Sequence, residues 1–410
     1  MKLSCKTILR PTKQQKLILD SYAFAATKLW NVGNYEKHNF EKLGFTEFPN
    51  WYEQKKRLKT HHWFKAMPSQ TAQEVLNGLH QAWKSFFTLT VTGGIADPKP
   101  PYYKKGLCHF SILNNGFKQD GNTFGITISK QQKAFLNKTH NLKVNCFKLE
   151  IPRFQDLSVI KQLCFYPQKN GTYQIIAVYE IPDTETIADN NHYLAIDPGV
   201  NNLATCYDSD GFSFIISGSQ YLNACHYYNK EIAWRQSILD TMEPDRKSCS
   251  SAISRLFQKR KHTIDDVLHK ATRLITNYCL ANAINTVILG DLTGIRKDKD
   301  LGHKKNQAFH CLPYLQFFKM LNYKLAQHGI DLIHQKEYYS SQCPPTSLIV
   351  SKTYAKPANR KKRGCYVNNN IIYNADSVGA FNILRLFLQS ISSPLVFIPI
   401  GLSNPIKVSV

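Results

Sequence analysis

Residues 193–202 read YLAIDPGVNN, in which a run of apolar residues ends at an aspartate followed by a tight turn. The run predicts a buried strand that carries Asp197 at its C-terminal end, and Pro198 and Gly199 predict the turn. Ligand and metal sites of open α/β sheets gather at the C-terminal ends of strands. Asp197 is therefore a candidate site residue. The alternative is that its carboxylate merely caps the turn that follows, a common role for aspartate.

The sequence after this stretch alternates strand and helix patterns. Residues 193–216 predict three strands, and a charged, helix-rich segment follows at about 221–282. The remaining elements are, in order, a buried strand at 287–289, an amphipathic helix that ends at Gly329, a strand at 330–337 and a last helix at 374–389. This is the order of elements in an RNase H-like α/β domain.

The last predicted helix carries a second candidate carboxylate. Asp376 lies in its first turn, where the helix dipole favours a negative charge, so a helix cap is the alternative to a functional role. Gly379 and Ala380, one turn later, predict a close approach to a neighbouring element. A two-metal nuclease centre needs about three or four acidic ligands around ions about 4 Å apart. That chemistry therefore requires a third carboxylate.

The N-terminal half reads as helices followed by a small β unit. Residues 3–9 alternate like a strand, and a helix is expected from about 13 to 40. A second helix is expected from Thr71, because Thr71 and Glu74 form a T-x-x-E capping-box pattern. Short strand patterns separated by turn residues fill about 108–185. We expect an all-β unit that the first strand completes, with the helices inserted in it.

The composition predicts a nucleic acid as partner. The 410 residues include 52 lysines and arginines against 29 aspartates and glutamates, a formal net charge of +23. With 43% hydrophobic residues the chain is too apolar for a disordered tail, and a folded protein this basic repels itself unless a polyanion covers it. No run of about 18 apolar residues exists, so no membrane partner is expected. Eleven cysteines without a CxxC pair predict a reducing, cytoplasmic location.

Four motifs resemble those of TnpB, the family of transposon-encoded RNA-guided nucleases related to compact type V CRISPR effectors and to Fanzor. They are KTILRPTKQQ at 6–15, IDPGVNNLAT at 196–205, KHTIDDVLHKATRLI at 261–275 and NADSVGAFNIL at 374–384. The stretch IDPGVNNLAT is similar to the family's first RuvC motif. The last is similar to its third, with Val378 where the family usually has asparagine.

The resemblance implies an α+β protein of two lobes. A wedge-like β-barrel at 1–10 and 96–187, with a helical recognition insert at 11–95, would form one lobe. An RNase H-like RuvC domain at 188–342 and 366–410 would form the other.

Residues 343–365 resemble a degenerate zinc ribbon with a basic sequence. TnpB proteins usually carry two CxxC pairs there, whereas here Cys343 and Cys365 stand alone. Two cysteines cannot fill a tetrahedral zinc site, so we expect no zinc. A chelate that adds His303 and His310 is one alternative, and a disordered, solvated loop is the alternative to a DNA-binding insert.

The second RuvC motif departs from the family pattern. It usually reads E-D-L with a metal-binding glutamate, and here it reads Gly290-Asp291-Leu292. Asp291 lies one residue later on a strand, so its side chain is expected on the opposite face. Glu337 ends the neighbouring predicted strand, and some relatives, Fanzor among them, are similar in using a later glutamate. The resemblance thus implies that Asp197, Glu337 and Asp376 are catalytic and hold two Mg²⁺ ions. A solvated Glu337 is the alternative.

Basic residues next to aromatic ones predict nucleic-acid contacts, because cations pair with phosphates and aromatic rings stack on bases. The candidates are Lys55, Lys56, Arg57, Trp63, Tyr103, Lys104, Lys105, Lys259, Arg260, Arg360, Lys361, Lys362 and Arg363. For each of them a solvated surface position is the alternative.

The resemblance implies an RNA-guided DNA endonuclease that acts as a monomer or dimer on its RNA. Such a protein binds a guide RNA and reads a short motif beside its double-stranded DNA target, while base pairing reads the target sequence. The rival hypothesis is a non-cleaving, RNA-guided DNA-binding transcriptional repressor. Gly290 and the lost zinc ribbon are also what a loss of nuclease activity would leave behind.

Overall fold

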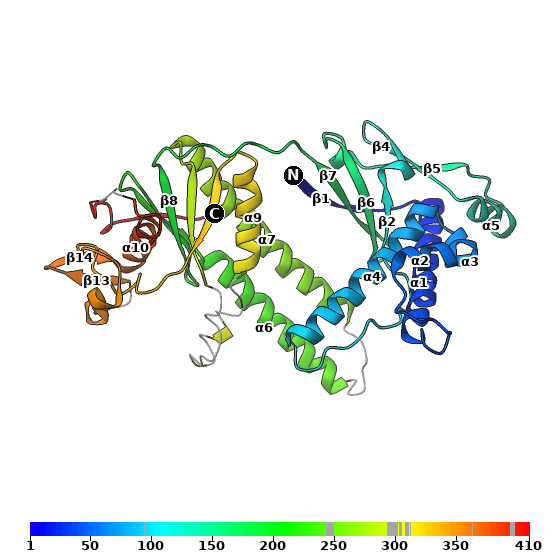
Figure 1. The fold of residues 1–410 in the computed structure, drawn as a ribbon, viewed down its shortest axis with the longest axis horizontal. Coiled ribbons are helices and arrows are strands. Elements are labelled where there is room, and N and C mark those ends of the chain that lie inside the picture. Colours follow the sequence, from blue (N-terminus) through cyan, green and yellow to red (C-terminus); the bar gives the residue numbers. More distant parts are fainter. Residues whose placement is uncertain are drawn as a thin grey trace. The chain divides into compact units, whose positions relative to one another are not determined.

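The computed structural model describes residues 1–93, 95–242, 250–292, 302, 306–307, 311, 313–362, 364–393 and 398–410. The chain divides into two compact units, Met1–Pro182 and Asp183–Val410 (Figure 1). In the parts of the chain that the structure describes, no helix is both long and apolar enough to cross a membrane.

The first unit contains two separate antiparallel sheets and a group of helices. Its elements are β1 (Lys2–Leu9), α1 (Lys13–His38), α2 (Trp51–Arg57), α3 (His62–Lys65), α4 (Ser69–Thr92), β2 (Phe110–Leu113), β3 (Phe117–Asp120), β4 (Thr123–Thr127), α5 (Lys130–His140), β5 (Cys146–Glu150), β6 (Ile160–Pro167) and β7 (Tyr173–Glu180). The sheets have the strand orders β1-β7-β6-β2 and β3-β4-β5. The first strand therefore completes the β unit by pairing with β7. The described strands form two open sheets where a barrel was expected.

The helix starts differ from the sequence prediction in one respect. The T-x-x-E pattern at Thr71 and Glu74 is not a capping box, because α4 begins earlier, at Ser69. Thr71 lies inside the first turn with its side chain buried and its hydroxyl oxygen unpartnered. The capping box that the structure does contain is at α1, where Thr12 and Gln15 satisfy each other's backbone N–H groups.

The second unit is built on one mixed six-stranded sheet. Its elements are β8 (Tyr193–Pro198), β9 (Asn202–Asp208), β10 (Ser213–Ser217), α6 (Ser219–Met242), α7 (Ser251–Ala281), β11 (Thr286–Gly290), α9 (Tyr314–Ala326), β12 (Asp331–Gln335), β13 (Cys365–Asn368), β14 (Ile371–Asn374), α10 (Ala375–Ser390) and β15 (Ile406–Val408). The strand order is β12-β11-β8-β9-β10-β15. β8, β11 and β12 are parallel, so their C-terminal ends share one edge.

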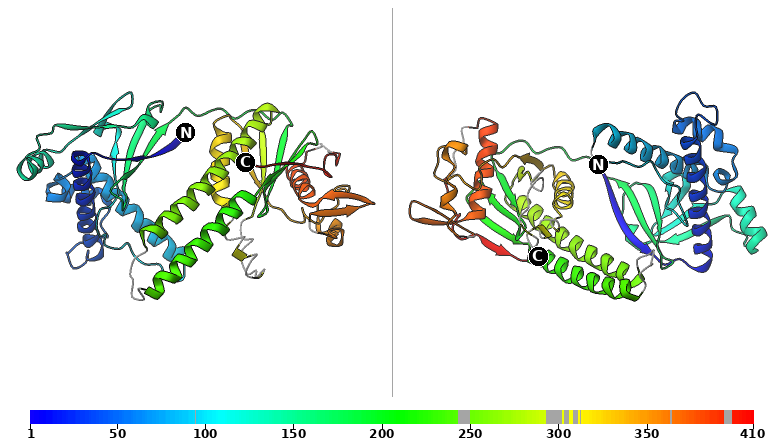
Figure 2. Two further views of the ribbon diagram at one scale, coloured as in Figure 1. Left: turned by 180° about the vertical axis from the view of Figure 1, so that it is seen from behind. Right: turned by 90° about the horizontal axis from the view of Figure 1, so that it is seen from below.

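Helices cover both faces of this sheet. Leu194 and Ile196 of β8 face an apolar core that includes residues of α7 and α9. Tyr193 and Ala195, which alternate with them, face a second core formed with α10. Both faces of β8 are therefore buried, which explains its continuous apolar sequence. Figure 2 shows the long helices α6 and α7 side by side, and a hydrogen bond from Arg260 to Asn229 joins them.

Candidate active site

Three sequence positions meet at the shared C-terminal edge of β8, β11 and β12. Ile196 pairs with Leu289 across the β8–β11 ladder, so Asp197 and Gly290 follow as neighbours at its end. Gly290 in turn pairs with Gln335 of β12, and Glu337 lies two residues farther along the chain. Parallel pairing thus brings residues 197, 290 and 337 to one edge of the sheet.

The Glu337 side chain fills the space that a side chain on residue 290 would occupy. A Cβ atom placed on Gly290 would lie 1.7 Å from Glu337 Oε1 and 2.7 Å from its Cδ. Glu337 Oε1 is buried and has no hydrogen-bond partner among the described residues. This carboxylate therefore points into the protein over the glycine, and it is not the solvated side chain of the alternative hypothesis.

Asp197 lies under helix α10. A Cβ atom on Gly379 would be 2.4 Å from Asp197 Oδ2, so the helix can approach this closely because residue 379 is a glycine. Burial, and then the negative charges of Glu337 and Asp376, raise the pKa of Asp197 well above its usual value, while the charge of Arg360 lowers it. Glu337 and Asp376 are therefore close enough to Asp197 to affect its pKa.

Asp376 is not the cap of α10. That role belongs to Asn374, whose side-chain oxygen accepts hydrogen bonds from the backbone N–H groups of Asp376 and Ser377 at 3.0 and 3.1 Å. The Asp376 carboxylate is used differently. Its Oδ2 accepts a hydrogen bond from Asn202 Nδ2 at 2.7 Å, and its Oδ1 lies 3.5 Å from Arg360 Nη2. Asn202 and Arg360 thus fix the orientation of this carboxylate.

Asp291 affects Glu337 electrostatically. Its backbone N–H donates to the carbonyl oxygen of Gln335 at 2.9 Å, which extends the β11–β12 pairing by one residue. Burial, and then the negative charge of Asp291, raise the pKa of Glu337 to about 7. Tyr314 covers the same strand end, because its hydroxyl donates to the Gly290 carbonyl oxygen at 2.9 Å.

The donor atoms at this edge suit Mg²⁺, which prefers carboxylate oxygens. The Oε1 atom of Glu337 is buried without a hydrogen-bond partner among the described residues, and burial and two neighbouring carboxylates raise the pKa of Asp197. In the described ranges, however, no group of three or more His, Cys, Asp or Glu side chains is positioned to hold a metal ion. The residue types fit the metal, and the Asp376 carboxylate contacts Arg360 and Asn202.

The basic insert is attached to α10 by hydrogen bonds. The side chain of Asn382, which is fully buried, donates to the carbonyl oxygens of Ser340 and Cys343 at 2.7 and 2.9 Å. Arg385 donates to the carbonyl oxygen of Pro344 at 3.2 Å. Sequence reasoning missed both residues, although their polar character inside an apolar helix was a signal. His303, His310 and Arg363 lie outside the described residues.

Several residues that were predicted to contact nucleic acid also contact side chains of their own unit. Lys104 Nζ lies 3.4 Å from the centre of the Trp30 ring, and burial lowers its pKa. Arg57 pairs with Glu36 at 3.1 Å. Contacts with side chains of their own unit also occupy Lys55, Trp63, Tyr103 and Arg260. Exposed positions remain for Lys56, Lys105, Lys259, Lys361 and Lys362.

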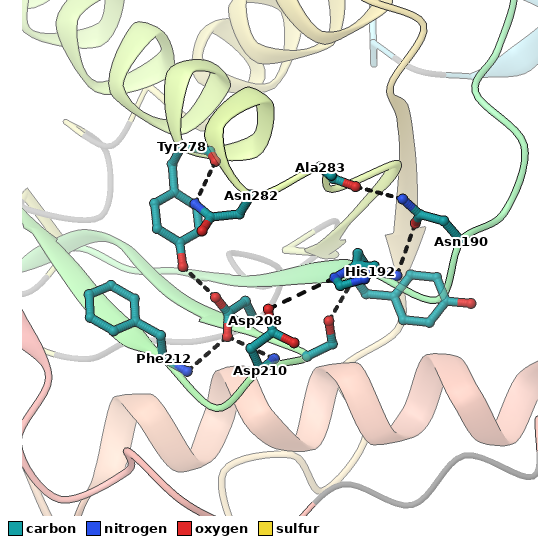
Figure 3. Close-up of polar contacts among 10 residues, drawn as sticks. Asn190, His192, Asp208, Asp210, Phe212, Tyr278, Asn282 and Ala283 are labelled. Carbon is teal, nitrogen blue, oxygen red and sulfur yellow. Dashed lines mark hydrogen bonds and ion pairs between the residues drawn. The ribbon is translucent and has the colours of Figure 1, made fainter.

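A polar cluster at the opposite edge of the sheet has a structural role (Figure 3). Asp208 Oδ1 accepts hydrogen bonds from the backbone N–H groups of Asp210 and Phe212 at 3.0 and 2.8 Å, and the Tyr278 hydroxyl donates to its Oδ2. Both carboxylate oxygens of Asp208 therefore accept hydrogen bonds, and Asp208 stabilises the turn between β9 and β10.

Comparison with known proteins found similar sequences and similar folds. Residues 176–296 match the family OrfB_IS605, described as probable transposase, and residues 314–383 match a Cas12f1-like TNB domain. The TnpB-like protein ORF457 of Acidianus two-tailed virus is 23% identical over 431 residues, covering 95% of this chain and 88% of the viral protein.

Solved structures of similar fold come from CRISPR effectors. A Cas12f1–sgRNA–target DNA complex matches with a TM-score of 0.58 at 14% identity, over 91% of this chain and 83% of that one. The mini-RNA-guided endonuclease CRISPR-Cas_phi3 matches with a TM-score of 0.53 at 10% identity, over 94% and 92%. The fold is therefore the mixed α+β fold of these compact effectors.

Together, these sequence matches show that the chain is similar to TnpB-like and Cas12f1-like proteins, in the viral relative over most of its length.

Proposed function

We propose that the protein is an RNA-guided DNA endonuclease whose RuvC-type acidic site is rearranged, with Glu337 replacing the glutamate absent at Gly290. The observation that carries this proposal is the overlap of the Glu337 carboxylate with the space above Gly290. The family relationship and the RNA- and DNA-bound complexes among the similar folds support RNA and DNA as partners. A net charge of +23 suits both.

In this proposal Asp197, Glu337 and Asp376 bind two Mg²⁺ ions, which would activate water and stabilise the leaving 3′ oxygen. Gly379 lets α10 approach Asp197, and Asn202 orients Asp376. The exposed lysines of the insert, Lys361 and Lys362, would attract the DNA backbone to this edge.

The test is a cleavage assay on the protein purified with its RNA. Sequencing the bound RNA defines a matching duplex, which is incubated with the complex and Mg²⁺. We expect double-strand breaks that disappear in Glu337→Ala and persist in Asp291→Ala, which removes a neighbouring carboxylate. Cleavage that survives Glu337→Ala would show that Glu337 is not required.

A second function, RNA-guided DNA binding without cleavage, is favoured by one observation. Within the described chain, no group of acidic, histidine or cysteine side chains is positioned to hold a metal ion. Such a protein would act as a transcriptional repressor. Tight, guide-dependent binding of the duplex without breaks in Mg²⁺ or Mn²⁺ would support this function and reject the nuclease.

A further inference from the structure

Arg360 contacts the carboxylate cluster from the basic insert. Its Nη2 lies 3.5 Å from Asp376 Oδ1, while Asn202 engages the other oxygen of the same carboxylate. Both oxygens of Asp376 therefore have partners. A divalent ion at Oδ1 would lie beside the guanidinium of Arg360, and the repulsion between the two positive charges opposes its binding while Arg360 stays in place.

The backbone around Arg360 is held in place. The N–H of Arg360 donates to the Pro357 carbonyl oxygen at 3.1 Å. The N–H of Lys356 and the hydroxyl of the buried Tyr366 both donate to the Gln342 carbonyl oxygen, at 3.0 and 2.9 Å. Gln342 lies five residues after Glu337, so the loop that carries Arg360 is attached to the segment that carries the third carboxylate.

The charges make this contact favourable in the absence of metal. Glu337 Oε1 has no hydrogen-bond partner among the described residues, and the charge of Arg360 also acts on Asp197, whose pKa it lowers. An arginine does not lose its proton in proteins, so its positive charge is permanent. Arg360 therefore supplies the cluster with one positive charge at the position where a divalent cation would otherwise be needed.

We propose that Arg360 is an internal counter-cation that competes with divalent metal ions for Asp376. The inference rests on the carboxylate metal site proposed above. Metal binding would displace the guanidinium from Oδ1 and free it to pair with an anion, while Asn202 continues to hold Oδ2. Arg360 is a positioning residue in this scheme, because it acts through Asp376.

The test measures Mn²⁺ binding to the metal-free chain by calorimetry and electron paramagnetic resonance, without DNA. Part of the Mn²⁺ binding is expected to depend on Glu337. Arg360→Gln should lower the Kd of that binding by about two- to fivefold, the range for a partly exposed ion pair. Arg360→Lys keeps the charge and is expected to stay within about twofold of the wild type. Lys352→Gln removes a charge from an exposed position of the same insert and is expected to leave the affinity unchanged.

The outcomes separate this inference from the proposed function. Equal or weaker Mn²⁺ binding in Arg360→Gln, with binding still abolished by Glu337→Ala, overturns the competition and leaves the metal site intact. If Glu337→Ala does not weaken Mn²⁺ binding, either in the wild type or in Arg360→Gln, the metal site is refuted and this inference with it. Thermal unfolding of each variant identifies any loss of affinity caused by misfolding.

Discussion

Replacing Gly290 by alanine tests the central geometry. The added Cβ would lie 1.7 Å from Glu337 Oε1 and 3.0 Å from Ile383 Cδ1. Because non-bonded carbon and oxygen atoms do not approach this closely, the carboxylate must move by more than about 1 Å, and a misplacement of about 1 Å can cost about 100-fold in rate. We expect Gly290→Ala to lower DNA cleavage by about 100-fold or more while guide RNA and target DNA still bind.

The same substitution has a second, independent readout in stability. Overpacking a buried position typically costs about 1–3 kcal/mol. In the Glu337→Ala background the clashing carboxylate is gone and only the 3.0 Å contact with Ile383 Cδ1 remains. The cost of Gly290→Ala should therefore be smaller, and the double-mutant cycle should give a coupling free energy of about 1–3 kcal/mol. Denaturant unfolding of the four proteins measures it.

The matched control is Gly125→Ala, another glycine within a strand. A Cβ atom there would meet nothing closer than 3.9 Å. It should leave both cleavage and the Glu337 coupling unchanged. Additive unfolding free energies for Gly290→Ala and Glu337→Ala would refute the overlap of the two residues.

The double variant Gly290→Glu, Glu337→Ala returns a glutamate to the second RuvC motif and is expected to regain part of the activity.

Three further predictions concern the same edge of the sheet. Burial and Asp291 raise the pKa of Glu337 from 4.5 to about 7, so the native state retains a proton that the unfolded chain loses. In EDTA the stabilisation from this bound proton is complete below pH 4.5 and is lost as the pH rises to about 7. The free energy of unfolding should fall by about 3 kcal/mol at most. Denaturation at pH 5 and pH 8 measures this loss, and an equal slope in Glu337→Gln would contradict the assignment. Gly379→Ala places a Cβ 2.4 Å from Asp197 Oδ2, so it should destabilise the protein by about 1–3 kcal/mol despite the better helix propensity of alanine; a rise in the unfolding midpoint would oppose that reasoning. Asn382→Ala removes two buried hydrogen bonds to carbonyl groups and a third that Asn382 Oδ1 accepts from Arg385. This loss should cost about 1–3 kcal/mol in an unfolding titration. Unchanged stability would mean that the insert is not held through Asn382.

Local patterns of the sequence predicted most elements of the second unit, but not the short strands β13, β14 and β15. The apolar run before Asp197 predicts β8 because a strand buried on both faces needs continuous apolar residues, and the structure has it at Tyr193–Pro198. The helix from residue 374 was predicted equally well. Its cap was not predicted correctly: Asp376 was considered for that role, and the cap is Asn374, two residues earlier.

Contacts of basic side chains with residues distant in the chain could not be predicted from the sequence. Only the tertiary structure shows that Lys104 contacts Trp30 and that Arg57 pairs with Glu36, and their contacts with nucleic acid stay predictions. The same holds for Thr71, whose pattern fits a capping box until the helix is seen to begin at Ser69. A pattern records which groups are available, whereas pairing depends on residues far away in the chain.

What the sequence by itself determined is the order of strands and helices, the position of Asp197 at a strand end and the vacancy at Gly290. The tertiary structure decided that the Glu337 carboxylate lies over Gly290 and that the Arg360 guanidinium pairs with Asp376. Glu337 reaches Gly290 because β12 pairs in parallel with β11, and Arg360 reaches Asp376 because its loop is bonded to Gln342. Both contacts depend on the register and packing of distant segments, which no local periodicity encodes.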